Sequence, residues 1–482
     1  MRSFADLGFQ RYDFLIIFGI GVFTFLFTKY IYPHIINFSL SKGWVGFDIH
    51  KKARPRTAES GGIGLIIGSV VGLIPLLIIY KDTEFVHGGI VLITTIIASG
   101  IIGFIDDRIR LSSMKKIILM VGCGVPLFLM NWFGYITVQS PTIPILGTLR
   151  LTIIYPLILP IIIAVMTNTV NMLEGYNGEG SGTSSIALFF MMLVSLIARS
   201  AEGFAFTIPC LAAIFAFYLF NKYPAKVFPG DVGTLGMGAI IGCIAILASI
   251  EVAMFCAMLT HIFNSFYVLT SIRGFKESHD IKIKDIFVDD KDMIYANFAK
   301  KAPVTLPRLL LVFGPLREDE LVNNFLALSF ICGLFALIAE LAKQWILPLG
   351  FHDGVFTWLL VCFCLIIYLI VINRFPRVFG ISFIMILLLL GGVGFLYFID
   401  RVLVQNPLNW LISGILGLIG LAIWYKVQMI YFWSRLEKNK DKTILIEPDI
   451  SKTQEENNKQ AEDSSASTKT KKKFSFSKLV KK

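Results

Sequence analysis

Long apolar runs separated by short polar segments make up most of this 482-residue chain. A membrane-spanning helix needs about 20 mostly apolar residues. Helices are the expected spanning form, because backbone groups in hydrocarbon must be hydrogen-bonded within the segment. The pattern predicts thirteen such helices, at roughly 14–36, 61–80, 88–105, 117–133, 151–167, 184–199, 206–221, 233–249, 252–270, 323–343, 356–373, 380–399 and 409–432.

The same pattern divides the chain into three regions. Residues 1–345 hold the first ten predicted helices and every polar motif, whereas 346–435 hold three further helices without an intramembrane acid. Residues 436–482 are rich in Lys, Ser, Glu and Asn, and such a tail buries no apolar core and is expected to be disordered. The predicted fold is therefore an all-α polytopic membrane protein: a ten-helix transmembrane core, about three extra C-terminal transmembrane helices and a disordered cytosolic tail.

Composition adds a topology to this picture. Of all residues 55% are hydrophobic, and the formal net charge is +11. Lys and Arg concentrate in one set of alternate connections, and few lie in the opposite set, which places the first set in the cytosol and the N-terminus outside. The cytosolic connections are then 37–60, 106–116, 168–183, 222–232, 271–322, 374–379 and the tail. The positive charge thus reflects membrane topology, and no nucleic-acid partner is expected. The seven cysteines lie in apolar segments without metal-ligand spacing and are expected to be buried small hydrophobes.

Two adjacent acids end the third predicted helix. Asp106 and Asp107 are followed by Lys116 at the start of the next helix. Neighbouring carboxylates repel each other and oppose the dipole at a helix C-terminus, so Mg²⁺ or a basic partner is expected to compensate them. The alternative is a pair of solvated loop acids beside basic neighbours. Lys116 lies where a cationic head can reach lipid phosphates.

A second motif is the run NTVNMLEGYNGEGSG at 168–182. Asn168, Asn171 and Glu174 recur every three residues, which places them on one face of a helix end. Gly175 then stops the helix, and three further glycines let backbone amides approach a ligand. Amide and carboxylate oxygens suit Mg²⁺. A plain glycine-rich connector is the alternative, but it leaves asparagines at membrane depth unexplained.

The third motif, Phe228-Pro-Gly-Asp231, immediately precedes the eighth predicted helix. An acid beside glycines at a helix N-terminus gives close backbone access to an anion or a metal. As a helix cap alone, Asp231 would be unremarkable. Because the asparagine run falls on the same membrane face, Asp231 becomes the expected second metal ligand. The motifs together predict a magnesium–phosphate site at the membrane boundary.

Two loops are further candidates. In the loop at 47–62, basic residues precede Glu59, and they serve either to bind phosphate or to fix topology. The long loop at 271–322 contains Arg273, His279 and Arg308 among acids and is a candidate lid over a nucleotide. For His279, a solvated loop histidine is the alternative.

With these motifs in view, residues 10–345 resemble the polyprenyl-phosphate N-acetylhexosamine-1-phosphate transferase family. The double aspartate with a later lysine, the Asn-x-x-Asn…Gly-x-Asn-Gly run and Phe-x-Gly-Asp occur in the family's order. Three details bring the chain nearer to archaeal and eukaryotic UDP-GlcNAc:dolichyl-phosphate GlcNAc-1-phosphotransferases. They are Glu59-Ser60 ahead of glycine, a lysine nine residues after the second aspartate, and Asn177 where bacterial relatives tend to have Asp.

The resemblance implies transfer of GlcNAc-1-phosphate, or a related N-acetylhexosamine 1-phosphate, from a UDP-sugar to polyprenyl or dolichyl phosphate with release of UMP. This is the first membrane step of lipid-linked glycan assembly, for N-glycans or cell-envelope polysaccharides. Mg²⁺ would be bound by Asn171 and Asp231, and the lipid phosphate would meet Lys116. The implied substrate contacts are Gly46, Phe47, Asp48, Glu59, Asn168, Glu174, Asn177, Arg273, His279 and Arg308.

For Asp106 and Asp107, three catalytic roles stay open: orienting the metal, deprotonating the lipid phosphate, or attacking directly to form a phospho-enzyme. A single displacement is the favoured route, because lipid phosphate is already an anionic nucleophile. Membrane lipids and a second copy in a homodimer are further expected partners. The expected location is the plasma membrane of a prokaryote or archaeon, or the endoplasmic reticulum of a eukaryote, with the active site on the cytosolic face.

The chain departs from the family in three places. The lid loop has neither the bacterial histidine-rich signature nor the compact eukaryotic Arg-His-Arg, Glu174 stands where bacterial members have Asp, and the last three helices exceed the usual ten. The main rival is an ion-coupled transporter, since intramembrane acids and broken helices also occur there. A transporter needs polar groups near mid-bilayer that are reachable from both faces, whereas these motifs cluster on one face.

Overall fold

The computed structural model describes residues 3–144, 147–148, 154–272, 274, 281, 283–346, 354–398 and 407–440. Its helices are α1 (Arg11–Ser41), α2 (Gly62–Ile79), α3 (Thr83–Ile109), α4 (Ser113–Trp132), α5 (Ile154–Leu173), α6 (Glu179–Ile197), α7 (Ala201–Asn221), α8 (Gly230–Leu247), α9 (Glu251–Ala257), α10 (Leu259–Ile272), α11 (Leu306–Leu311), α12 (Glu318–Ile346), α13 (Gly354–Arg374), α14 (Arg377–Phe398) and α15 (Pro407–Lys438). Short strands are β1 (Val45–Phe47), β2 (Arg56–Ala58), β3 (Thr142–Ile143), β4 (Gly147–Thr148), β5 (Ile286–Val288), β6 (Met293–Ala296) and β7 (Leu316–Arg317).

The all-α multi-pass membrane fold is confirmed. Within the described residues, eleven helices are long and apolar enough to cross a membrane, and the bent pair α9–α10 brings the number to twelve. The thirteenth predicted segment, 409–432, lies inside α15, which is not among those twelve. The predicted tail begins at 436, still within α15, and its part from 441 onward lies outside the described residues. The division at 345 and 435 into separate domains stays a prediction.

The ninth predicted span differs from a straight helix. It is broken at Met258 into α9 and α10, which are bent by 67° relative to each other. The Asn264 side chain of α10 donates to the Met172 carbonyl at 2.8 Å and accepts from the Leu306 main-chain nitrogen at 3.0 Å. These bonds tie α10 to the ends of α5 and α11. No proline or glycine lies between 251 and 272, so the usual sequence signal of a kink is missing.

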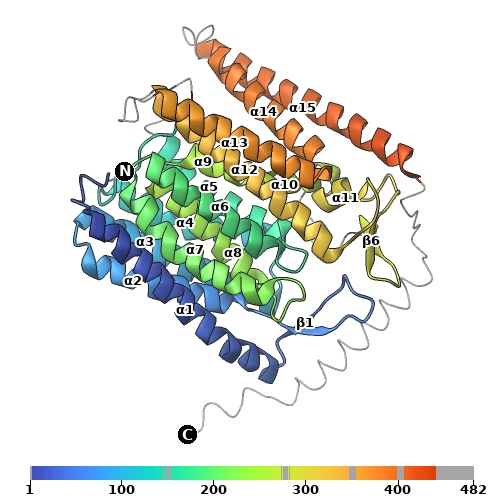
Figure 1. The fold of residues 1–482 in the computed structure, drawn as a ribbon, viewed down its shortest axis with the longest axis horizontal. Helices are drawn as coiled ribbons and strands as arrows, with labels where there is room; N and C mark the ends of the chain where they lie inside the picture. The colour runs from blue at the N-terminus through green and yellow to red at the C-terminus, as the bar shows by residue number, and fades with distance from the viewer. Residues whose placement is uncertain are drawn as a thin grey trace.

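Helix α8 is the centre of the bundle and packs mainly against α3 and α5, as Figure 1 shows. In its apolar window 89% of the residues are buried. Small residues at helix crossings let membrane helices approach closely. A Cβ on Gly103 of α3 would lie 2.5 Å from the Asp231 carbonyl oxygen, and one on Gly238 would overlap the Thr167 main chain of α5. Glycines therefore set the distance between α8 and the helices beside it.

Two small sheets lie at one end of the bundle (Figure 1). Strands β1 and β2 pair antiparallel, with Val45 opposite Ala58, and β5–β6–β7 form an antiparallel sheet of three strands. We call this end, which also carries residues 106–107, 174–182 and 228–231, the polar end. Strands β3 and β4 form an antiparallel hairpin between α4 and α5.

The first prediction concerns Gly62, at the start of α2. A Cβ there would overlap the main-chain nitrogen and Cα of Gly233, so Gly62→Ala forces α2 away from α8. Overpacking of this kind costs about 1–3 kcal/mol, and we expect a lower thermal unfolding midpoint for the detergent-solubilised protein. Gly122→Ala is the matched control, because no atom lies within 4 Å of its added Cβ. An equal drop in both variants would contradict the close crossing.

Candidate active site

A cavity of about 350 Å³ opens at the polar end. Five parts of the chain form its walls: β1 with the loop after it, Glu59 between β2 and α2, the end of α3, the end of α5 with its glycine loop, and the turn before α8 with the start of that helix. These parts carry all the polar motifs that the sequence singled out, apart from the long loop at 271–322. The topology therefore brings segments more than 180 residues apart in sequence (48 and 231) to one site.

The two predicted metal ligands both line this cavity and are in direct contact with each other. The Asn171 side-chain nitrogen of α5 lies 2.5 Å from Asp231 Oδ1 of α8. Lys116 Nζ of α4 lies 3.2 Å from Asp231 Oδ2 and forms a closer ion pair with Asp106. Residues from four helices, α3, α4, α5 and α8, thus converge on the Asp231 carboxylate.

The two adjacent aspartates of α3 have different surroundings. Asp107 Oδ1 accepts from the Asp231 main-chain nitrogen at 2.6 Å, and Asp107 Oδ2 accepts from Ser60 Oγ at 3.3 Å. A Cβ on Gly230 would lie 2.5 Å from the same carboxylate, and Gly230 has φ +64°, so glycine is required there. Asp107 therefore caps the N-terminus of α8 from a neighbouring helix and lines the cavity.

Asp106 points the other way, toward α4. Its Oδ1 accepts from the Leu111 main-chain nitrogen at 2.6 Å, and its other oxygen pairs with Lys116. Asp106 is buried, with 4% exposure. Its position suits holding the Lys116 ammonium rather than meeting a substrate.

The charges of this cluster suit a divalent cation. Asp106, Asp107 and Asp231 supply three carboxylates. Lys116 supplies one ammonium, so the ionised cluster has an excess of two negative charges. The oxygen and nitrogen of an asparagine amide exchange places by a half-turn, and the Asn171 oxygen would then stand beside the Asp231 carboxylate. Carboxylate and amide oxygens, with open space for substrate oxygens and water, are what Mg²⁺ takes.

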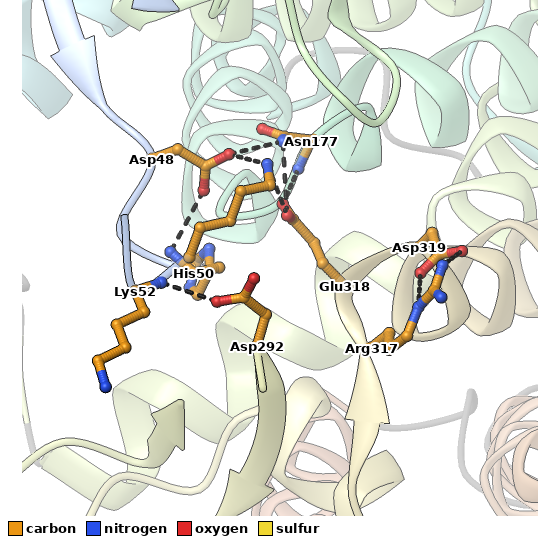
Figure 2. Close-up of polar contacts among 9 residues, drawn as sticks. Asp48, His50, Lys52, Asn177, Asp292, Arg317, Glu318 and Asp319 are labelled. Carbon is orange, nitrogen blue, oxygen red and sulfur yellow. Dashed lines mark hydrogen bonds and ion pairs between the residues drawn. The ribbon is translucent and has the colours of Figure 1, made fainter. Parts of the chain in front are cut away.

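A second polar cluster lies at the other side of the cavity (Figure 2). The Asn177 side chain donates to Asp48 Oδ2 at 2.9 Å, and its main-chain nitrogen donates to Glu318 Oε1 at 2.8 Å. Lys51 forms an ion pair with Asp48 and lies 3.4 Å from Glu318 Oε2. Asp48 and Asn177, two predicted nucleotide-sugar contacts, are thereby brought into direct contact with each other.

The same cluster also resembles a metal site but is better explained otherwise. Asp48, His50 and Glu318 each offer a ligand atom, and these atoms all lie within 4.8 Å of one another. The Lys51 ammonium already pairs with the carboxylates of Asp48 and Glu318, so a cation would have to displace it. We therefore assign this cluster to the binding of a polar substrate group.

His50 is neutral in this setting. Its ring stacks on Tyr176 with centroids 4.2 Å apart, and 8% of the residue is exposed. Burial lowers the pKa of His50 to about 4, and nearby Asp48 and Lys51 make smaller, opposing contributions. The histidine thus offers a flat neutral ring to the cavity.

Glu174 lies just past the end of α5 and lines the cavity. It accepts from the Gly180 main-chain nitrogen at 2.7 Å, which holds the glycine loop against α5. Burial raises the pKa of Glu174 to about 8; the bond from Gly180 lowers it and nearby Glu318 raises it further. Glu174 is therefore largely protonated near neutral pH and acts on the loop rather than as a metal ligand.

The remaining predicted contacts divide into two groups. Glu59 and Phe47 line the cavity, and Gly46 lies beside them in β1. Asn168 does not belong to the lining; its side chain donates back to the Ala164 carbonyl at 2.7 Å within α5. The three-residue spacing correctly places Asn168 on the same face of α5 as Asn171. Asn168 nevertheless lies about one helical turn farther from the polar end, and so does not reach the cavity. Its predicted substrate contact is not supported.

Arg308 corrects a second expectation. It was predicted to contact the nucleotide, yet it is fully buried in α11, with 0% exposure. Its guanidinium donates to the main-chain carbonyls of Asn297, Ala299, Ala302 and Pro303 at 2.6–3.0 Å. All its donors therefore serve the fold of the loop. Arg273 and His279 lie outside the described residues.

Four residues of the cavity and of the polar cluster beside it were not singled out by the sequence analysis: Lys51, His50, Tyr176 and Glu318. The first two belong to the basic run after β1, for which phosphate binding and membrane topology were both left open. Tyr176 was passed over inside the glycine run. Glu318 carries no local signal, because it reaches Asn177 from 141 residues away.

The chain is similar in sequence to several named transferases. The family described as glycosyl transferase family 4 matches residues 89–249. A protein of Sulfolobus acidocaldarius, provisionally named a UDP-N-acetylglucosamine–dolichyl-phosphate N-acetylglucosaminephosphotransferase, is 29% identical over 326 residues, 66% of this chain and 93% of its own. A provisionally named glycosyltransferase of Methanocaldococcus jannaschii is 27% identical over 322 residues, 66% and 94% of the two chains. A phospho-N-acetylmuramoyl-pentapeptide-transferase of Clostridium beijerinckii is 27% identical over 273 residues, 53% and 81% of the two chains.

The second prediction follows from His50. Its pKa falls from an ordinary 6.5 to about 4 on folding, so the folded state binds fewer protons between these values. The free energy of unfolding should therefore fall as the pH falls from about 6.5 to about 4. His50 contributes at most about 3 kcal/mol to this fall. His50→Phe keeps a ring on Tyr176 without a titrating group and should flatten the fall in unfolding midpoint over this window. His34→Gln, at an exposed histidine of α1, should leave the wild-type pH profile unchanged; a His50→Phe profile identical to wild type would contradict the assignment.

Proposed function

The chain belongs to glycosyl transferase family 4, and on this premise we propose that it transfers N-acetylglucosamine 1-phosphate from its UDP-sugar to a polyprenyl phosphate of the dolichyl type, releasing UMP. The observation that carries the proposal is the convergence of Asn171, Lys116 and Asp107 on Asp231 at the mouth of one cavity. A cluster of ionic groups beside the apolar bundle matches a reaction between a soluble diphosphate and a lipid phosphate.

Asn171 and Asp231 would hold Mg²⁺, which when bound neutralises the diphosphate and the charge that develops on the leaving UMP. The fit rests on the facing amide and carboxylate and on the two excess negative charges of the cluster. Phosphoryl transfer depends chiefly on positioning and charge neutralisation, and the remaining residues supply these.

The proposed step is a single displacement. An oxygen of the lipid phosphate forms a bond to the sugar-bearing phosphorus of the UDP-sugar. The bond from that phosphorus to the bridging oxygen breaks, and this oxygen leaves with UMP. Lys116, held by Asp106, binds the lipid phosphate. Asp107, which lines the cavity, takes the proton when the lipid phosphate arrives as a monoanion.

The nucleotide is assigned to the other side of the cavity. Asp48 and Asn177 offer a carboxylate and an amide there, and the neutral His50 ring lies beside them on Tyr176. Such a set binds a polar heterocycle by hydrogen bonds and ring contacts. The distribution of basic residues supports a cytosolic location for this end of the bundle, where a nucleotide sugar is supplied. A transporter would need comparable polar groups reaching both faces.

The third prediction tests the reaction and Asp231 together. The purified protein with UDP-GlcNAc, Mg²⁺ and a polyprenyl phosphate should release UMP, measured by coupled assay or chromatography. Asp231→Asn should lower kcat by about 100-fold or more, because it removes a charged ligand where charge develops. Glu437→Gln, at an exposed carboxylate of α15, is the control and should keep wild-type activity. Absence of UMP release by wild type across UDP-N-acetylhexosamines, or unchanged activity of a folded Asp231→Asn, would overturn the proposal.

The fourth prediction concerns Lys116. Lys116→Ala should raise KM for the polyprenyl phosphate several-fold more than KM for the UDP-sugar, since loss of a charge-assisted bond costs about 1.5–3 kcal/mol. Lys115→Ala, one residue earlier and exposed, removes the same charge from the surface and should leave both constants unchanged. Equal rises of both constants in Lys116→Ala would remove its assigned role.

A further inference from the structure

The end of α15 reaches the polar end from outside the predicted ten-helix core (Figure 1). The rings of Phe432 and Trp433 cover the Arg308 guanidinium, each with its centroid 5.3 Å from the guanidinium carbon. Phe432 is itself buried, with 2% exposure. A buried cation placed over aromatic faces is attracted by the ring quadrupoles and shielded from water.

Arg308 organises the segment that precedes it. Its N–H groups donate to carbonyls between 297 and 303, which gathers an irregular stretch of chain around one side chain. We call residues 283–317, with β5, β6, α11 and β7, the cover segment. Since the edges of the guanidinium are occupied by this segment, contact with another element is left to its faces. Helix α15 supplies two rings that lie on one side of the guanidinium, with their centroids 4.9 Å apart.

The cover segment in turn touches the nucleotide side of the cavity. The Lys52 main-chain nitrogen donates to Asp292 Oδ1 at 2.8 Å (Figure 2), and the Lys52 side chain pairs with Asp290. At its end, β7 leads directly into Glu318, which accepts from the Asn177 main-chain nitrogen. The loop after β1 and the glycine loop are therefore both tied to the cover segment.

Helix α15 is anchored by more than the contact with Arg308. Its Gln428 accepts a hydrogen bond from Tyr267 of α10, and its Trp424 ring packs edge-on against Phe263, with centroids 5.4 Å apart. Because α10 belongs to the bundle, these contacts fix α15 to the body of the protein. The rings of 432 and 433 are thus held at a defined place.

We propose that α15 positions the cover segment over the nucleotide side of the active site, with Phe432 and Trp433 as positioning residues that act through Arg308. The Phe432 and Trp433 rings contact the Arg308 guanidinium, which donates to main-chain carbonyls between 297 and 303. The cover segment in turn contacts Lys52 and, through Glu318, Asn177. The consequence for substrate binding rests on the proposed function, whereas the mechanical coupling does not.

Hydrogen–deuterium exchange tests the coupling without any substrate. The double variant Phe432→Leu/Trp433→Leu keeps apolar side chains but removes both aromatic faces. We expect its β5–β7 amides and the Lys52 amide to exchange about 10-fold faster, because local opening is easier. Phe432→Tyr/Trp433→Phe retains the rings and should exchange like wild type, as should Ile430→Ala, whose side chain is 69% exposed on the same helix.

Steady-state kinetics tests the consequence. The double leucine variant should raise KM for UDP-GlcNAc about 5- to 10-fold while KM for polyprenyl phosphate stays near wild type, and the ring-retaining variant should restore it. A general loss of stability would instead affect both substrates and would not depend on the rings.

Faster exchange confined to α15, or equal rises of both KM values, would overturn the proposal. The two hypotheses fail separately. If wild type releases no UMP, the proposed function falls, but the exchange pattern still decides whether α15 holds the cover segment.

Discussion

The contact of Asp231 with Asn171, Asp107 and Lys116 is the interaction on which the rest of the structure depends. It requires α8 to begin within hydrogen-bonding distance of α3, α4 and α5. Gly103 allows this approach, because any side chain there would collide with the main chain of Asp231. The crossing of α3 and α8 therefore determines both the packing of the bundle and the geometry of the site. The residues that pack in the core also fix the positions of the charged side chains around Asp231.

This arrangement separates two environments along each helix. The bodies of the helices are mostly apolar and interact with one another or with lipid, whereas the ionic groups of the site lie where α3, α5 and α8 reach the polar end. Ionisable groups are expensive in hydrocarbon and persist where they have partners or water. A site built at this boundary is open to a soluble anion and also within reach of a phosphate that is anchored in the bilayer.

The fold class and the residues of the charge cluster could be predicted from the sequence. Acids and amides at the ends of apolar segments are energetically unfavourable in a membrane, so they stand out from their apolar neighbours and indicate a function. Asn171 and Asp231 were identified for this reason. The prediction was wrong where one residue type can serve either a ligand or the fold. Arg308 is a cation in a loop, and only tertiary contacts show that it serves the loop rather than a ligand. Glu318 and the bend at Met258 depend on partners far away in sequence, so no local pattern announces them.

The C-terminal helices contact the rest of the protein at few places. Helix α13 has 11% of its apolar window buried, against 89% for α8, so it contributes little to the core. Lipid covers such a surface as well as another helix does, and apolar contact alone explains little of the association. Specific partners are found instead at the end of α15, where rings cover a guanidinium that organises the cover segment. A bundle that touches the core lightly but reaches the active-site cover is better explained by control of that cover than by support of the core.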